Sequence, residues 1–244
     1  MKDSGNYALV LGGSKGLGLG SVRKLCREGI PVIALHRDRR KDLETIRETF
    51  EGIREAGGQL YSFNGDVLSR ERRPEWLETF KELLGNARIG AVIYSIAKGN
   101  LKPMQGPDKG SRLTSRDFLL TAEAMAYTFY DWVSDLIRAE MLASDCRVIA
   151  FTSEGSHKVL PNYAAVGSAK ASLEAIVRQM AVEWAPLGIR ANCIQAGVTD
   201  TESLRRIPGS EKILSQSIRR NPSGRLTSPG DVGDAVYLLC RPEA

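Results

Sequence analysis

The chain has 244 residues, of which 42% are hydrophobic and 26% charged, a balance that excludes a disordered chain, a collagen-like fibre and a disulfide-dense secreted module. Its formal net charge is only +5 and its basic residues are scattered, so composition gives no support for nucleic-acid binding. No apolar run approaches the roughly 20 residues that cross a bilayer, and the N-terminal sequence lacks a signal-peptide pattern. We therefore expect a cytoplasmic protein with no membrane partner.

Six short apolar runs predict buried strands, and amphipathic segments between them predict helices. The strands are expected at 7–12, 30–35, 60–65, 89–96, 146–153 and 189–197, and the helices at 17–28, 40–56, 71–85, 116–143, 162–186 and 230–241. Because nearly all-apolar strands alternate with helices, we predict an α/β fold with a doubly wound parallel sheet (Rossmann), three layers and a single domain over 1–244.

Two segments interrupt this alternation, and both follow the carboxyl ends of predicted strands. They span 97–115 and 198–229, and the second contains Pro208, Gly209, Pro222 and Gly224. Loops at this edge of a parallel sheet usually carry the binding site. For the second segment, about 198–229, we predict a substrate lid with one or two short helices.

The four cysteines, Cys26, Cys146, Cys193 and Cys240, lie far apart in apolar surroundings. They form no CxxC pair, and no histidine lies at the spacing of a metal ligand. We predict reduced core thiols and no metal site.

A glycine-rich segment follows the first predicted strand and opens the first predicted helix. Gly12, Gly16 and Gly18 have the spacing GxxxGxG. Glycine permits a tight turn and lets backbone amides approach a pyrophosphate at the helix N-terminus. We predict a dinucleotide site that also includes Ser14, Lys15 and Leu17, with a plain glycine-rich turn as the alternative.

The end of the second predicted strand indicates which dinucleotide is preferred. Arg37 stands where a protein that uses NAD offers a carboxylate to the adenosine ribose. Arg37, helped by Lys15, would pair with a 2′-phosphate, so the sequence favours NADPH over NADH. The alternative is that Arg37, Arg39 and Arg40 form a solvated helix start.

With these signals in this order, essentially the whole chain resembles the short-chain dehydrogenase/reductase family. Further motifs match in sequence order: Asp66-Val67, Ser95-Ile96-Ala97, Gly197 and Thr201, with Ser153 at the family's serine position and Tyr163 and Lys170 after it. The resemblance implies that Asp66, Val67, Ser95, Ile96, Ala97, Lys170, Gly197, Val198, Thr199 and Thr201 contact the cofactor.

The tyrosine and lysine have an unusual spacing. Ordinary members of the family carry tyrosine four residues before the lysine, where this chain has Val166, and Tyr163 precedes Lys170 by seven. Seven residues rotate by about 700°, so both side chains share one helix face, about 10.5 Å apart along the axis. Gly167, between them on that face, has no side chain to obstruct the lysine.

This Tyr-x6-Lys pattern resembles the enoyl-acyl carrier protein reductases. The turns YSIA (94–97), AYTF (126–129) and AGVTDT (196–201) are also similar to theirs, and no asparagine lies between residues 116 and 143. The glycine motif is of the ordinary kind, so the combination resembles the NADPH-dependent branch called type III. A tyrosine packed in the interior and a surface lysine are the structural alternative.

The resemblance implies an NADPH-dependent reduction of the 2,3 double bond of a trans-2-enoyl thioester on acyl carrier protein, in fatty acid elongation. Tyr163 would hydrogen-bond the oxygen that gains negative charge, Lys170 would hold the ribose and favour ionisation of the tyrosine, and Ser153 would add a polar contact. It also implies a homotetramer built on the helices at 116–143 and 162–186, and one further strand beyond the six expected here.

Two other functions stay open from the sequence. Ser153 favours an NADPH-dependent ketoreductase that acts on a 3-oxoacyl thioester or a small ketone, whereas the missing asparagine and the displaced tyrosine suit a non-catalytic dinucleotide-binding sensor. Four arginines in the predicted lid, Arg205, Arg206, Arg219 and Arg220, either dock an acidic carrier protein or form solvated helix faces.

Overall fold

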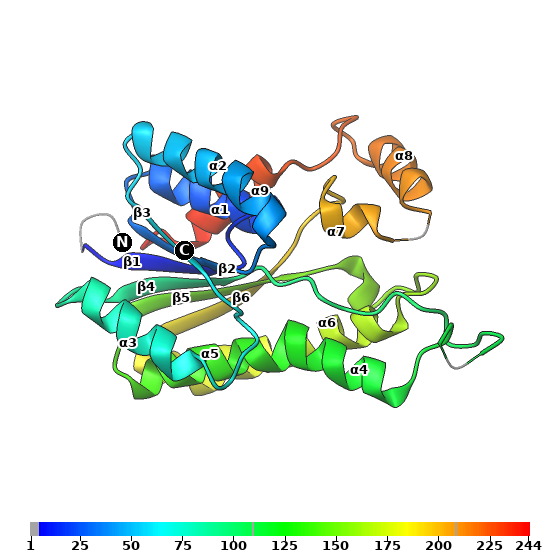
Figure 1. Cartoon of the computed structure of the whole chain (residues 1–244), viewed down its shortest axis with the longest axis horizontal. Helices are drawn as coiled ribbons and strands as arrows, with labels where there is room; N and C mark the ends of the chain where they lie inside the picture. Colours follow the sequence, from blue (N-terminus) through cyan, green and yellow to red (C-terminus); the bar gives the residue numbers. More distant parts are fainter. Residues whose placement is uncertain (1–4, 109, 208) are drawn as a thin grey trace.

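The structure is a computed structural model that describes residues 5–108, 110–207 and 209–244. Six parallel strands form one sheet in the order β3-β2-β1-β4-β5-β6 (Figure 1). They are β1 (Tyr7–Leu11), β2 (Val32–His36), β3 (Leu60–Asn64), β4 (Ile89–Tyr94), β5 (Leu142–Thr152) and β6 (Ile189–Gln195). The order reverses between β1 and β4, which confirms the predicted doubly wound sheet and places a crevice at that point.

Helices cover both faces of the sheet, so the fold has three layers (Figure 1). One face is covered by α1 (Gly16–Arg27), α2 (Leu43–Glu55) and α9 (Pro229–Leu239), and the other by α3 (Arg73–Leu84), α4 (Ser115–Ala122), α5 (Thr128–Arg138) and α6 (Ala164–Glu183). Alternate residues of β1 enter different cores, with Leu9 and Leu11 in one and Ala8 and Val10 in the other. This is why the strands are apolar at nearly every position.

The predicted helix over 116–143 is wrong as a continuous element. A π-helical turn, η3 (Glu123–Tyr127), separates α4 from α5, and α5 ends at Arg138. Inside the turn, the buried Tyr94 hydroxyl donates a 2.5 Å hydrogen bond to the carbonyl oxygen of Ala124. At the other end, Glu140 has a left-handed backbone (φ 54°), which ends the helical geometry before β5 begins at Leu142.

The boundaries of other helices and strands differ from the predicted ones by a few residues. Pairing of β2 with β1 starts at Val32 and not at residue 30, because Pro31 has no amide hydrogen to donate. Short 3-10 turns lie at η2 (Arg40–Asp42), η4 (Glu154–Ser156) and η5 (Ala185–Leu187). The first of these takes up the beginning of the helix predicted from residue 40.

The segment after β6 contains α7 (Glu202–Arg205) and α8 (Ser210–Arg220), two short helices beside the carboxyl ends of the strands (Figure 1). A parallel bridge between Thr199 and Thr227 joins the beginning of this segment to its end. The two helices agree with the prediction for 198–229, and a lid movement stays a prediction. Pro208 lies outside the described residues.

The structure also tests the predictions for cysteines, metal ligands and membrane-spanning segments. All four cysteines are free thiols, and Cys26, Cys146 and Cys240 are buried. Over the described ranges, we find no group of three metal-ligating side chains and no helix that could cross a bilayer.

Candidate active site

The glycine loop between β1 and α1 is built on close backbone approaches. Gly12 has a φ of +92°, and a side chain there would lie 2.4 Å from the carbonyl oxygen of Ser95. A Cβ on Gly18 would lie 2.1 Å from the carbonyl oxygen of Gly12. These glycines are therefore required, and they bring the loop against the end of β4.

The N-terminus of α1 fits a phosphate. The helix has 12 residues, no acidic residue in its first turn and no side chain that caps its first amides. Its free amides and its dipole favour an anion at this position. The bare glycine loop and the uncapped helix together are what a dinucleotide pyrophosphate requires.

Asp38, which follows β2, joins this strand to the glycine loop. Its buried carboxylate accepts hydrogen bonds from Ser14 Oγ (2.6 Å) and His36 Nδ1 (2.9 Å) and lies 3.3 Å from Lys15 Nζ. Burial alone would raise the pKa of Asp38, but the hydrogen bonds from Ser14, His36 and Lys15 outweigh it and lower the pKa below its ordinary value. Asp38 thus binds Ser14 and Lys15, two side chains that were predicted to bind the cofactor.

Both cations predicted to meet a 2′-phosphate have carboxylate partners within the chain. Lys15 Nζ also lies 3.1 Å from Asp42 and 3.6 Å from Glu202 of α7. Arg37, which is 60% exposed, forms an ion pair with Asp66. Its exposure leaves the guanidinium accessible to a ligand.

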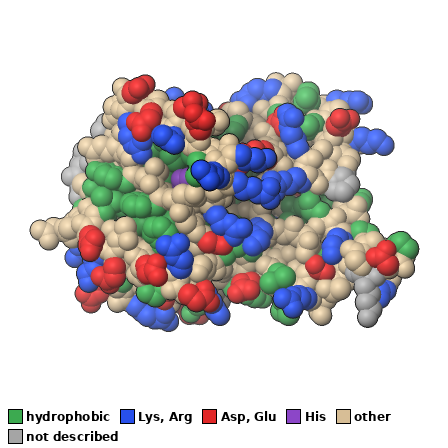
Figure 2. Space-filling view, viewed as in Figure 1, with side chains coloured by type: hydrophobic (Ala, Val, Ile, Leu, Met, Phe, Trp, Pro, Cys, Tyr) green, Lys and Arg blue, Asp and Glu red, His purple; other side chains and the backbone are tan. Residues whose placement is uncertain are grey.

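Basic side chains gather on this part of the surface. In Figure 2, Lys and Arg cluster in the middle of the view, over the segment that joins β2 to α2. This segment contains four basic residues between positions 37 and 41. This local charge suits an anionic group of the cofactor.

The structure brings Tyr163 and Ser153 together. Their hydroxyl oxygens lie 3.3 Å apart, with Ser153 directly after β5 and Tyr163 at the N-cap of α6. The tyrosine ring packs against two glycines: a Cβ on Gly155 would lie 2.5 Å from the ring, and one on Gly167 would lie 3.7 Å from it. Helical spacing singles out Gly167, whereas Gly155 lies outside the helix and has no such signal in the sequence.

Burial raises the pKa of Tyr163, and the hydrogen bond with Ser153 opposes this rise only in part. Lys170 is not among the groups that shift it. The expected lowering of the tyrosine pKa by the lysine is therefore absent from this structure.

Lys170 is buried on α6, and its Nζ donates a 2.6 Å hydrogen bond to the carbonyl oxygen of Phe151. Burial lowers the pKa of this ammonium group to about 8. A surface lysine, the alternative interpretation, is excluded by this burial. Tyr163 and Lys170 both reach the end of β5, and each contacts a different residue there.

The remaining predicted residues lie at the carboxyl ends of three other strands. Asp66 and Val67 follow β3, and Thr201 caps α7 by accepting a hydrogen bond from the Leu204 amide (3.2 Å). The others directly follow β4 and β6 and are Ser95, Ile96, Ala97, Gly197, Val198 and Thr199. The fold thus gathers residues from separate parts of the chain at one edge of the sheet.

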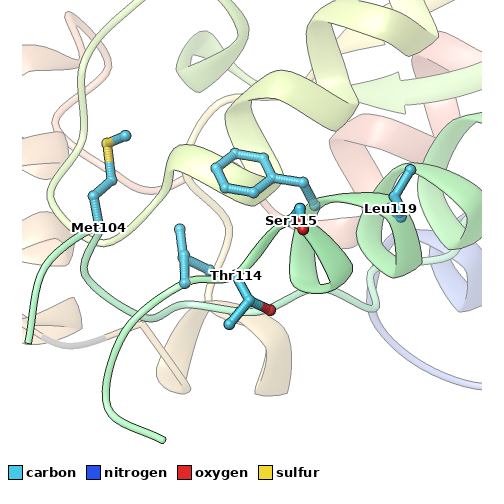
Figure 3. A pocket seen from close by; sticks show the side chains of 6 residues that line it. Met104, Thr114, Ser115 and Leu119 are labelled. Atoms are coloured by element: carbon cyan, nitrogen blue, oxygen red, sulfur yellow. The ribbon is translucent and has the colours of Figure 1, made fainter. Parts of the chain in front are cut away.

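An apolar hollow lies outside this group, at the beginning of α4 (Figure 3). It is lined by Met104, Leu113, Thr114, Ser115, Phe118 and Leu119. None of these is a predicted cofactor or catalytic residue, so the hollow does not define the candidate site.

A family model described as enoyl-(acyl carrier protein) reductase matches residues 12–244. The chain belongs to the short-chain dehydrogenase/reductase family. It is therefore an NAD(P)H-dependent oxidoreductase, which argues against the non-catalytic alternative.

Similar proteins support this assignment. A tropinone reductase homolog of Arabidopsis thaliana is 31% identical over 98% of this chain and 88% of its own length. An NADPH enoyl-acyl carrier protein reductase, FabI of Staphylococcus aureus (strain MRSA252), is 28% identical over 92% of this chain and 85% of its own. The crystal structure of an NADH enoyl-acyl carrier protein reductase from Aquifex aeolicus VF5 superposes with a TM-score of 0.83 at 24% identity, covering 97% of this chain and 89% of that chain, and shows that the fold is shared.

The buried Lys170 gives this short-chain dehydrogenase/reductase a pH-dependent stability. Its pKa falls from an ordinary 10.5 to about 8, so the unfolded chain binds the extra proton between these values. The charged lysine thus weakens the fold below pH 8, and this penalty, at most about 3 kcal/mol, disappears as the pH rises toward 10.5. We expect the stability advantage of Lys170→Met over the native chain to shrink by 1–3 kcal/mol, roughly, between pH 7 and pH 10.

Urea unfolding of the two proteins at four pH values measures this difference, and the groups common to both cancel. A difference that stays constant across the range would show that Lys170 titrates normally.

Proposed function

We propose that the protein reduces the 2,3 double bond of a trans-2-enoyl thioester with NADPH, and that the acyl group is carried on acyl carrier protein in fatty acid elongation. The observation that carries this proposal is the placement of Tyr163 and Lys170. With seven-residue spacing, both reach the end of β5, the strand next to β4 in the sheet. The family model with the enoyl reductase description and the similarity to FabI support the same activity.

Each site residue has a defined task in this reaction. When bound, NADPH would supply a hydride to the β-carbon, and a proton from solvent at the α-carbon would complete the reduction. Tyr163 donates a hydrogen bond to the thioester carbonyl oxygen, which gains negative charge as the double bond is reduced. Its raised pKa keeps this hydroxyl protonated, and therefore a donor, at neutral pH. Ser153 orients the phenol, and Lys170 binds the nicotinamide ribose.

The glycine loop holds the rest of the cofactor. Gly12, Gly16 and Gly18 admit the pyrophosphate to the α1 N-terminus, with Ser14, Lys15 and Leu17 beside it. Arg37 and Lys15 exchange a carboxylate partner for the 2′-phosphate, which makes NADPH preferred over NADH. Asp66, Val67, Ser95, Ile96, Ala97, Gly197, Val198, Thr199 and Thr201 line the adenine and nicotinamide sides.

A second candidate is an NADPH-dependent ketoreductase. The hydrogen-bonding distance of 3.3 Å between Ser153 and Tyr163 favours it, because a paired serine and tyrosine can bind and protonate the oxygen of a ketone. The similarity to a tropinone reductase homolog also supports it.

We further propose a cytoplasmic homotetramer that contacts acyl carrier protein through the segment 198–229. Three of its arginines already have acidic neighbours: Arg205 pairs with Asp200 at 2.7 Å, Arg206 lies 3.9 Å from Glu202, and Arg220 lies 3.8 Å from Glu154. All three are at least two-thirds exposed, so an acidic carrier could still reach them.

Replacing Tyr163 with Phe tests the proposed reaction. We expect Tyr163→Phe to lower kcat for crotonyl thioester by about 100-fold or more, because the donor to the developing charge is lost. The Kd of NADPH, measured by its fluorescence, should stay nearly the same. Tyr127→Phe, on an exposed tyrosine of η3, is the matched control.

Native turnover of crotonyl thioester should exceed that of acetoacetyl thioester. The reverse order would favour the ketoreductase, and full activity of Tyr163→Phe on both substrates would remove the tyrosine from the mechanism.

Replacing Arg37 with Ala tests the preference for NADPH. We expect Arg37→Ala to raise the Kd of NADPH by about 10-fold or more and to leave that of NADH nearly unchanged, because only NADPH has the 2′-phosphate. Arg47→Ala, on an exposed arginine of α2, should change neither value. An equal loss of affinity for both cofactors would contradict the assignment.

A further inference from the structure

Three successive residues at the end of β5 are each bonded to a side chain of α6 or its N-cap. The carbonyl oxygen of Phe151 accepts from Lys170, and the Ser153 hydroxyl lies against that of Tyr163. Between them, the Thr152 hydroxyl donates to the carboxylate of Glu174. The first and third of these contacts involve predicted catalytic residues, whereas Glu174 has no role in the function described so far.

Glu174 follows Lys170 by one helical turn on α6. Residues four apart in a helix lie on the same face, so the half-buried Glu174 and the buried Lys170 are neighbours. Thr152 lies on the strand that both side chains approach. The carboxylate is thus tied to the end of the strand that precedes Ser153, on the helix face that also carries Lys170.

Few other ionisable groups surround Lys170 within the described part of the chain. Cys193 of β6 is one, and Tyr163 at the N-cap of α6 is another. At the end of β5, the Phe151 carbonyl and the Thr152 and Ser153 hydroxyls face α6, and none of these groups carries a charge. Arg178, one helical turn after Glu174 on α6, is exposed, and its charge acts to lower the pKa of Cys193.

The thiol and the phenol are neutral where Lys170 titrates. Burial raises the pKa of Cys193 to about 11 and also raises that of Tyr163, so neither group is charged near pH 8. Cys193 and Glu174 both oppose the effect of burial on the pKa of Lys170, and Glu174 is the one of the two that is a carboxylate.

We propose that Glu174 is a positioning residue of this site, which holds the end of β5 against α6 through Thr152 and supplies the negative charge beside the Lys170 ammonium. The inference rests on the proposed function, because it concerns the same lysine and tyrosine. It adds a residue that contacts neither substrate nor cofactor and acts through Lys170 and Ser153.

The charge is tested without cofactor or substrate. With [13Cε]lysine-labelled protein, NMR titration follows each lysine, and Lys170→Met identifies the Lys170 signal. We expect Glu174→Gln, which keeps an oxygen to accept from Thr152, to lower the pKa of Lys170 by about one unit. Glu174→Asp should recover most of the shift. Glu183→Gln, the same change at an exposed position at the end of α6, should cause none.

The contact with β5 is tested separately. Thr152→Val removes the hydrogen bond and keeps the charge, so we expect kcat to fall several-fold while the pKa of Lys170 stays the same. In Glu174→Gln, the alkaline limb of the pH profile of kcat/KM should move to lower pH, together with the NMR value.

An unchanged pKa of Lys170 in folded Glu174→Gln overturns the electrostatic part of the proposal, and an unchanged kcat in Thr152→Val overturns the positioning part. If the native chain reduces neither thioester, the proposed function fails, whereas the NMR result still decides whether Glu174 supplies the charge.

Discussion

The buried ammonium group of Lys170 is the constraint on which the rest of the site depends. A charge taken out of water is costly unless it is hydrogen-bonded or paired. The Lys170 ammonium group donates a hydrogen bond to a backbone carbonyl oxygen near the end of β5. Phe151 lies one residue beyond Ala150, the last residue of β5 that pairs with β4, while its pairing with Ile194 of β6 continues. Ser153 and Tyr163 then meet two residues further along, so the position of the lysine and that of the phenol are set by the same few atoms of backbone.

The second requirement is close backbone approach. Gly155 leaves room for the Tyr163 ring and Gly167 for the carbonyl oxygen of Gly155, as Gly12 leaves room for the carbonyl oxygen of Ser95 and Gly18 for that of Gly12. At both places, a methyl group would displace backbone or a rigid ring, so the sequence cannot vary freely there. The shape of the glycine loop and of the site around Tyr163 therefore depends on glycines as much as on the polar residues that line them.

The fold follows from local sequence patterns, whereas most of the site residues are predicted from the family resemblance. Apolar strands, helical periodicity and the glycine motif predict the doubly wound sheet, and the structure confirms its six parallel strands. Contacts between distant residues carry no such local signal. The bond of Tyr94 to Ala124 within the π-helical turn, the tie of Asp38 to Ser14 and that of Thr152 to Glu174 each join positions more than 20 residues apart. Only the absence of asparagine in the helix at 116–143 hinted that this region is unusual. The expected effect of Lys170 on the tyrosine was wrong for this structure, because spacing along a helix does not reveal which acceptor the lysine reaches.

A crystal structure of the chain with NADPH and an unreactive enoyl thioester analogue tests the account most directly. The account predicts that the Tyr163 hydroxyl lies within about 2.6–3.2 Å of the thioester carbonyl oxygen and that Lys170 Nζ contacts the nicotinamide ribose. A Tyr163 hydroxyl directed into the protein or toward bulk solvent, with both ligands bound in the crevice, would contradict it.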